Sequence, residues 1–300
     1  MRWEDFGASD NVEDRRGQGG GGFGLPLPGG RGGLGIGTMI IIGIIAWALG
    51  IDPRILIQGA EIFTGGGSGY ERQAPVPQPG RQGAPTDQMG RFASAILKNT
   101  EVVWSQVLPA QMNRQYSPAG LVLYTRGTRS GCGVAQSAMG PFYCPVDRKV
   151  YLDVSFFQEM QRKFGTGGDF AYAYVIAHEV GHHIQNILGI LSKVQGRMQQ
   201  VGEGESNQLS VRLELMADCL AGVWAKNSND RFNAISESDM RQAVAAAQAI
   251  GDDRLQERAQ GEAMPDTFTH GSSEQRVRWL LTGFKSGQIQ SCDTFRASRL

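Results

Sequence analysis

The sequence has no surplus of either charge, since its 29 lysines and arginines are balanced by 29 aspartates and glutamates. Proteins that bind nucleic acid draw much of their affinity from positive charge, so this balance argues against a nucleic-acid partner. No two of the four cysteines form a Cys-x-x-Cys pair, which argues against zinc-ribbon and thioredoxin-type sites. Histidine is as scarce, with four residues in 300, yet three of them fall between positions 178 and 183. The strongest chemical signal of the chain therefore lies in that short stretch.

The N-terminal part differs in composition from the rest. Residues 1–33 are rich in glycine and bury too little apolar surface to offset the entropy of ordering, so we expect a disordered tail. Residues 34–51 (LGIGTMIIIGIIAWALGI) follow without a single charge. A helix of this length spans roughly 27 Å, enough for a bilayer core. We expect one transmembrane helix here, followed by a flexible Gly/Pro/Gln-rich linker over residues 52–87.

The flanking charges predict an orientation. Arg15, Arg16 and Arg31 precede the apolar run, and only Arg54 closely follows it. This bias predicts a single-pass membrane protein with a cytoplasmic N-terminus and the remainder in the periplasm or outside the cell. A cleaved signal peptide is the alternative, because residues 46–48 read Ala-Trp-Ala, but the long polar lead favours an uncleaved anchor.

Residues 88–300 have the pattern of one folded α+β domain, mainly helical with a small sheet. Short runs between turn residues predict strands, and apolar periods of three to four predict helices. Asp169 is the expected N-cap of the central helix. The expected strands are 120–125, 133–140, 141–145 and 149–157, and the expected helices are 89–108, 169–189, 210–226, 237–256 and 272–287.

The helix over 169–189 contains HEVGH, in which His178 and His182 are four residues apart. Residues at this spacing lie on one helical face, so both imidazoles can bind one metal ion. The pattern His-Glu-x-x-His within an apolar helix is typical of zinc peptidases, in which the glutamate, here Glu179, acts as the general base. We therefore predict a Zn2+ site, and we expect Gly181 to let another segment approach this helix closely.

A catalytic zinc ion needs a third protein ligand. A histidine six residues beyond His182 would serve, but that position is Leu188. A glutamate on a later helix is the other solution, and Glu214 stands among apolar residues in LELMADCLAG. A buried carboxylate without a cationic partner is costly, so we assign Glu214 as the third ligand. Glu203 and Glu205 are weaker ligand candidates, because we expect them to lie in a polar, glycine-containing loop.

The residues around the ligands also receive roles. Asp218 stands one turn after Glu214, and we expect it to accept the spare ring N–H of a ligand histidine. The alternative for both carboxylates is a pair of ordinary salt bridges. His183 is predicted to lie behind the metal site or at the surface. His270 and Arg276 are the candidate catalytic donors to the oxyanion of a tetrahedral intermediate.

These parts indicate peptide hydrolysis, in which zinc activates water and Glu179 moves the proton. We expect a protein or peptide substrate, which would pair with a strand over 141–145 or 150–153. The alternative is a catalytically silent or latent peptidase-fold scaffold that binds proteins at the membrane, with residues 194–208 covering the cleft in the latent form.

Five segments taken together resemble a bacterial family of neutral zinc metallopeptidases: GCGVAQSAMGPFYCPVDRKVYLD, AHEVGHHIQ, ELMADCLAGVWA, THGSSEQRVRWLLTGFKSG and CDTF. The resemblance extends from the Gly-rich N-terminus through the apolar run to Phe295. It implies a zincin-like endopeptidase domain, whose ligands would be His178, His182 and Glu214. Together with the composition, it also points to a single-pass protein of the cell inner membrane. The order of the motifs is also similar to that of membrane zinc proteases with several spans, whose substrates do not carry over to a chain with one predicted span.

Disulfide bonds are expected if this domain lies outside the cytoplasm. Cys132 with Cys144 would close a loop around the strand segment. Cys219 with Cys292 would tie the helix of Glu214 to the C-terminal tail. Buried free thiols are the alternative, above all for Cys219 on its apolar helix.

Overall fold

The computed structural model describes residues 1–17, 80–83 and 85–300. The predicted transmembrane helix over 34–51 lies outside these residues, as do residues 18–33 of the predicted tail and residues 52–79 of the predicted linker. Within the described ranges, no helix is both long enough and apolar enough to cross a membrane. The predicted α+β class is confirmed, because helices predominate and are accompanied by one five-stranded sheet and a separate hairpin.

The sheet has the strand order β2-β1-β3-β7-β6. Its three inner strands run parallel to one another, and the two edge strands pair antiparallel. The hairpin β4-β5 is stapled to the edge strand β6 by the Cys132–Cys144 disulfide. The strands are β1 (Val12–Asp14), β2 (Arg81–Gln82), β3 (Gly120–Tyr124), β4 (Gly127–Ser130), β5 (Gly133–Gln136), β6 (Phe142–Cys144) and β7 (Lys149–Asp153).

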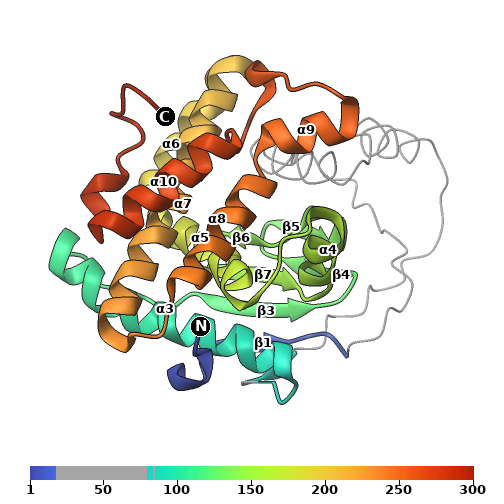
Figure 1. The fold of residues 1–300 in the computed structure, drawn as a ribbon, viewed down its shortest axis with the longest axis vertical. Coiled ribbons are helices and arrows are strands. Elements are labelled where there is room, and N and C mark those ends of the chain that lie inside the picture. Colours follow the sequence, from blue (N-terminus) through green and yellow to red (C-terminus); the bar gives the residue numbers. More distant parts are fainter. Residues whose placement is uncertain (18–79, 84) are drawn as a thin grey trace, which may run out of the picture.

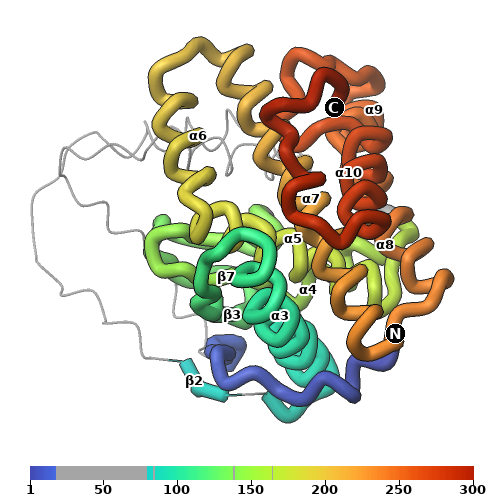
Figure 2. Tube along the Cα trace, turned by 90° about the vertical axis from the view of Figure 1, so that its left-hand side faces the viewer, coloured from blue at the N-terminus to red at the C-terminus, as the bar shows by residue number. Residues whose placement is uncertain are grey.

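The helices pack against the sheet and against one another. Helix α5 lies between the sheet and the layer formed by α7, α8 and α10 (Figure 1). Seen from the side, α10 runs beside α7, while α3 lies next to the strands (Figure 2). The Cys219–Cys292 disulfide joins α7 to the C-terminal segment, so both expected disulfides are present. The helices are α3 (Gln88–Met112), α4 (Ser155–Phe164), α5 (Asp169–Ile187), α6 (Ile190–Met198), α7 (Glu203–Phe232), α8 (Glu237–Ala249), α9 (Asp252–Gln260) and α10 (Ser273–Ser286).

Several predicted boundaries were wrong. The expected strand over 149–157 ends at Asp153, where the carboxylate accepts the Ser155 N–H at 2.9 Å just as α4 begins. The expected helix over 237–256 is interrupted before Asp252. Residues 194–208 belong mostly to α6 and α7, so they form a helical hairpin and not the polar loop that we expected. The N-cap of α5 is Gly168, and Asp169 is its first residue.

The first residues of the chain belong to the folded domain. β1 pairs in parallel with β3, from Val12↔Leu121 to Asp14↔Leu123. The side chains of Phe6 and Val12 are buried in the main core. The expectation of a disordered tail is therefore wrong for residues 1–17, and the domain does not begin at residue 88. The reason is tertiary: a short polar segment with few apolar side chains gains order from a neighbouring strand that is already in place.

This pairing restricts the topology of the chain. Strands that exchange hydrogen bonds occupy one space, so residues 1–17 and 85–300 lie on the same side of any membrane. The carboxylate of Glu13, in β1, also accepts hydrogen bonds from Lys149 Nζ in β7 (2.9 Å) and from the Gly80 N–H (3.0 Å). The sheet is incompatible with the expected arrangement in which a cytoplasmic N-terminus and an external domain are separated by one span.

Candidate metal centre

Helices α5 and α7 approach each other closely at Gly181. A Cβ atom at this position would lie 3.0 Å from the carbonyl oxygen of Ala217 and 3.1 Å from its Cα atom. A larger residue would push the helices apart, so the glycine places Glu214 and Asp218 of α7 opposite His178 of α5. The prediction that Gly181 permits a close approach is confirmed.

The three predicted metal ligands converge. His178 and His182 of α5 and Glu214 of α7 offer ligand atoms that all lie within 4.8 Å of one another. The Glu214 carboxylate is 3.1 Å from His178 Nε2 and 3.4 Å from His182 Nε2. Two imidazole nitrogens and one carboxylate are a donor set that Zn2+ prefers in catalytic sites. The residues present therefore fit a zinc ion.

Each ligand histidine is held through its other ring nitrogen. His178 Nδ1 lies 2.8 Å from the Asp218 carboxylate, as the sequence predicted. His182 Nδ1 lies 2.9 Å from the side-chain oxygen of Gln185, whose amide donates to the Leu213 carbonyl at 2.7 Å. These contacts fix the N–H on Nδ1 in both rings and leave the Nε2 lone pairs for a metal ion.

Asp218 is fully buried and joins His178 to residues that lie behind the predicted metal ligands. It accepts hydrogen bonds from Tyr174 Oη at 2.5 Å and from Arg276 Nε and Nη2 at 2.9 and 3.0 Å. Arg276 also donates through Nη1 to the carbonyl of Ile250 at 3.2 Å. Burial acts to raise the pKa of Asp218, but Arg276 and His178 hold it below its usual value. The buried carboxylate is therefore ionised and able to orient His178.

These contacts assign Arg276 a different role from the predicted one. Its side chain is 4% exposed, and its Nε and Nη2 groups bind the carboxylate that lies behind His178. An oxyanion donor has to face the substrate, and a guanidinium engaged in this way does not. Arg276 is a positioning residue that neutralises Asp218.

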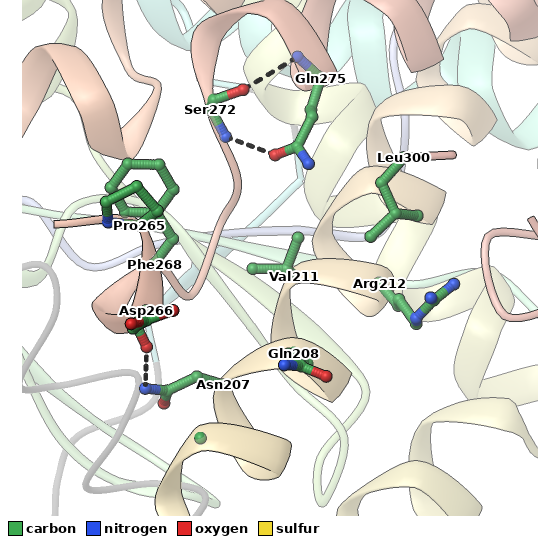
Figure 3. Close-up of a pocket in the computed structure, with 11 residues that line it drawn as sticks. Asn207, Gln208, Val211, Arg212, Pro265, Asp266, Phe268, Ser272, Gln275 and Leu300 are labelled. Atoms are coloured by element: carbon green, nitrogen blue, oxygen red, sulfur yellow. Dashed lines mark hydrogen bonds between the residues drawn. The ribbon is translucent and has the colours of Figure 1, made fainter. Parts of the chain in front are cut away.

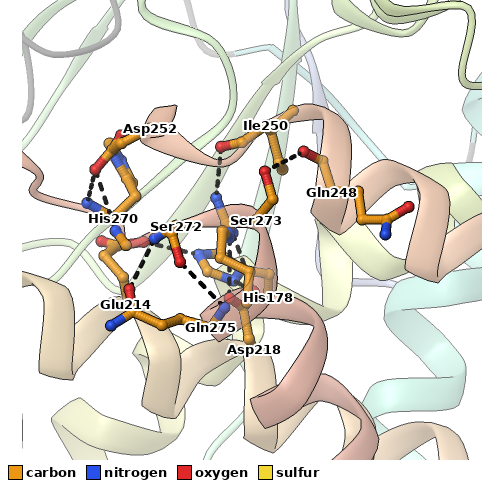
Figure 4. Close-up of polar contacts among 12 residues, drawn as sticks. His178, Glu214, Asp218, Gln248, Ile250, Asp252, His270, Ser272, Ser273 and Gln275 are labelled. Atoms are coloured by element: carbon orange, nitrogen blue, oxygen red, sulfur yellow. Dashed lines mark hydrogen bonds and ion pairs between the residues drawn. The ribbon is translucent and has the colours of Figure 1, made fainter. Parts of the chain in front are cut away.

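His270 lies between the carboxylates of Asp252 and Glu214 (Figure 4). The Asp252 carboxylate accepts the backbone N–H groups of Thr269 and His270 at 2.7 Å and that of Gly271 at 3.1 Å. It also lies 3.3 Å from His270 Nδ1. Burial acts to lower the pKa of His270, but Glu214 and Asp252 raise it overall. The ring is thus held in place, with Nε2 as the nitrogen that remains for a substrate.

Glu179 is 8% exposed and has neighbours of both charges. Burial raises the pKa of its carboxyl, while His178 and His182 oppose the rise. Burial also acts to lower the pKa of His178, yet Asp218 and Glu214 bring it to about 10 in the metal-free protein. Such surroundings stabilise positive charge between the two helices, whether it is carried by a proton or by a metal ion.

The other sequence candidates lie apart from the cluster. His183 is fully buried, with Nδ1 2.9 Å from Tyr143 Oη and Nε2 2.7 Å from the Ser117 carbonyl, so it links α5 to β6 and to the segment before β3. Glu203 is exposed in the first turn of α7, and Glu205 pairs with Arg197 at 2.9 Å. The weaker ligand candidates are therefore not part of the metal centre.

Comparison with known proteins agrees with this donor set. Residues 1–295 match the family described as "Putative neutral zinc metallopeptidase". The chain belongs to this family. It is 45% identical over 303 residues to a protein of Escherichia coli K12 named "Uncharacterized protein YpfJ", covering 99% of this chain and all of the relative. It is 42% identical over 216 residues to "Uncharacterized protein Rv2575" of Mycobacterium tuberculosis, covering 69% of this chain and 70% of the relative. No solved structure matches it.

Three residues that hold the side chains of this site escaped the sequence reasoning. Tyr174 stands four residues before His178, and Gln185 three residues after His182, so helical spacing alone could have found both. Asp252 had no such signal, because it meets His270 only through the packing of the α8–α9 connection against the start of α10.

Proposed function

We propose that this protein is a zinc-dependent endopeptidase. The observation that carries the proposal is the convergence of His178, His182 and Glu214, with Glu179 adjacent to them and a buried carboxylate behind His178. Two histidines from one helix and a glutamate from a later helix leave one coordination position for water or substrate. The family description supports the same class.

A bound zinc ion would lower the pKa of a water molecule and polarise the scissile carbonyl. Glu179 accepts the proton of the attacking water and delivers it to the leaving amine. Its burial in this position favours that exchange, because a carboxyl whose pKa is raised toward neutrality takes up the proton of water more readily and holds it until the leaving amine accepts it.

His270 stabilises the negative charge that develops on the carbonyl oxygen. Burial acts to lower the pKa of His270, but the Asp252 carboxylate beside Nδ1, which is not a metal ligand, acts to raise it and favours the imidazolium form, which donates from both nitrogens. One donor is directed at Asp252, and the other, on Nε2, is available to the substrate oxygen. Asp252 keeps the ring and the segment over 269–271 in place.

The compartment follows from the disulfides. Both cysteine pairs are oxidised, so we propose that the domain works in an oxidising compartment such as the periplasm or the cell exterior. Anchoring through residues 34–51 stays a prediction. Residues 1–17 would share the compartment of the domain, because they contribute β1 to its sheet.

The test uses the full chain and measures zinc content together with cleavage of casein and of a peptide library. The parent, the Glu179→Gln variant and a matched Glu203→Gln control, which makes the same change at an exposed residue of α7, are compared. We expect about one zinc ion per chain in all three proteins and cleavage by the parent and the control alone. Zinc without cleavage in the parent would support the silent or latent scaffold. A parent that binds no zinc would refute the assignment.

A further inference from the structure

The described residues that line the pocket between α7 and the segment over 265–275 offer no free positive charge (Figure 3). The pocket has a volume of about 700 Å3, and Arg212 is the basic residue of its lining. The guanidinium of Arg212 donates to the carbonyl oxygens of Thr294 and Ala297 in the C-terminal segment. Arginines without such partners lie on another part of the described surface, around the hairpin β4-β5.

The hairpin β4-β5 has a buried face and an exposed face. Its strands pair Thr128 with Ala135 and Arg129 with Val134. Cross-strand partners point to one face of a hairpin, and successive residues alternate between the faces. Thr128 and Ala135 are buried, so Arg129 and Val134 lie together on the outer face. An arginine and an apolar side chain that is 37% exposed are thus direct neighbours at the surface.

The turn between β6 and β7 extends this outer face. At the tip of the hairpin, the Gly131 N–H donates to the Asp147 carboxylate at 2.7 Å, and the disulfide between the hairpin and β6 holds the two segments together. Val146 and Arg148 flank Asp147 and are exposed, Val146 at 73%. Val146 and Val134 are two of the three large apolar side chains that are exposed among the described residues, so apolar exposure is concentrated here. The surface is called the hairpin face below, and it consists of Arg129, Val134, Val146 and Arg148.

The exposed charge of the hairpin face is positive. Within the described part of the chain, the guanidinium groups of Arg129 and Arg148 have no hydrogen-bond or ion-pair partner. The adjacent acidic residue is directed inward, because one oxygen of Asp147 is buried and the other accepts a hydrogen bond from Tyr151 Oη at 2.6 Å. Two free cations beside exposed apolar side chains form a surface that suits the anionic headgroups of a membrane.

The chain leaves the folded domain next to this face. Arg15 follows β1 and donates through Nη1 to the carbonyl oxygen of Arg129 at 2.8 Å. The described residues end at Gly17 and resume at Gly80, whose N–H donates to the Glu13 carboxylate at 3.0 Å. Both ends of the intervening chain therefore lie beside the hairpin, and that chain contains the uncharged run over 34–51, for which we predict entry into a bilayer. An anchor attached at this place holds the hairpin face toward the headgroups.

We propose that the hairpin face is a docking surface for a lipid bilayer that carries anionic phospholipids. Arg129 and Arg148 bind phosphate groups, because a guanidinium forms paired hydrogen bonds to phosphate oxygens. Val134 and Val146 enter the interface between headgroups and acyl chains, where their apolar area is buried. Each arginine strengthens the contact with an anionic surface about fivefold, so the docking depends on headgroup charge and on salt.

Fluorescence quenching in nanodiscs tests the docking on the full chain. All four cysteines are in disulfides, so a single introduced cysteine can be labelled with an environment-sensitive dye. Val146→Cys places the dye in the hairpin face, and Ser238→Cys places it at an exposed position of α8 as the matched control. The discs contain phosphatidylcholine alone or with phosphatidylglycerol, and some of the lipid carries a nitroxide quencher near the headgroup. We expect strong quenching at position 146 in anionic discs, weaker quenching there in neutral discs, and none at position 238.

The role of the arginines is tested in the Val146→Cys chain. Arg129→Gln together with Arg148→Gln should reduce the quenching in anionic discs to the level of the neutral discs. Arg241→Gln together with Arg296→Gln removes the same charge from exposed side chains elsewhere and should leave the quenching unchanged. Raising the salt concentration from about 0.1 M to about 1 M should also remove the difference between the discs, because the screening length falls from about 10 Å to about 3 Å. The salt measurement decides if the arginine variant fails to fold.

Three results would overturn the proposal: equal quenching at positions 146 and 238, equal quenching in neutral and anionic discs, or quenching that persists in the arginine variant and at high salt. A full chain that binds neither disc would overturn it as well. Absence of quenching at position 146 in a chain that is bound to the disc would refute the lipid assignment and leave the hairpin face to an acidic protein partner.

Discussion

Replacing Gln185 by methionine tests whether the orientation of His182 controls metal affinity. Gln185 is fully buried on α5, and its side-chain oxygen lies 2.9 Å from His182 Nδ1. Methionine has nearly the same length and shape but offers only a weak acceptor, so the ring loses the contact that fixes its N–H on Nδ1. The tautomer of His182 that leaves a lone pair on Nε2, the nitrogen that faces Glu214, is then no longer favoured.

The expected loss can be estimated from this geometry. Removal of a partner that orients a ligand histidine costs about 10- to 100-fold in metal affinity, or about 1.4 to 2.7 kcal/mol. The metal-free protein should lose less, about 1 kcal/mol, because the Leu213 carbonyl that Gln185 also contacts lies inside α7 and keeps its helical partner. The variant should therefore fold and bind zinc weakly.

The assay is competition for zinc against a fluorescent chelator, with thermal unfolding in the presence and absence of zinc. A matched control is Gln195→Met on α6, which makes the same chemical change away from the cluster. We expect the dissociation constant to rise at least tenfold in Gln185→Met and to stay within about twofold in the control. A Gln185→Met protein that folds and binds zinc as tightly as the parent would refute the reasoning.

The remaining predictions concern the sheet, the ligand proton and the second disulfide. Deletion of residues 1–17 should leave the domain unfolded. Replacement of residues 18–79 by a short Gly-Ser linker should keep the melting temperature, since β1 and β2 are paired neighbours. A deletion variant as stable as the parent would contradict the role of β1. Burial acts to lower the pKa of His178, but Asp218 and Glu214 hold it at about 10, so zinc binding at pH 7–8 should release a proton and tighten as the pH rises. Calorimetry in buffers of different ionisation enthalpy measures that proton, and its absence would refute the charge assignment. Replacing both Cys219 and Cys292 by serine opens a loop with a sequence separation of 73 and should cost about 4 kcal/mol in urea unfolding; a loss below 1 kcal/mol would show that the α7 connection is stable without the bond.

Part of the metal centre could be predicted because its determinants are local. A spacing of four residues on a helix places two side chains on one face in any surroundings, so His178 and His182 were predictable from the sequence alone. Glu214 and Asp218 were predictable from the free-energy cost of burying a charge, because two carboxylates in an apolar helix require a cationic partner. The structure brings both carboxylates to His178.

The predicted role of Arg276 was wrong, because its partner is set by the packing of segments far apart in the sequence. The sequence places it after His270 at the start of a helix, and it does not tell which of the two faces the metal centre. In the fold, α10 turns Arg276 toward Asp218, while the Asp252 carboxylate gathers the segment over 269–271 and holds His270.

The sequence by itself determined the candidate metal ligands, the α+β class and the existence of most helices, because periodicity and ligand spacing are properties of a short stretch of chain. Only the tertiary structure decided that the first residues complete the sheet and which residues hold the ligand histidines. Those outcomes depend on contacts between segments far apart in the sequence: β1 gains its order from β3, and Asp252 meets His270 across the junction of α8, α9 and α10. Such contacts are selected by the free energy of the whole fold, and no single segment carries them.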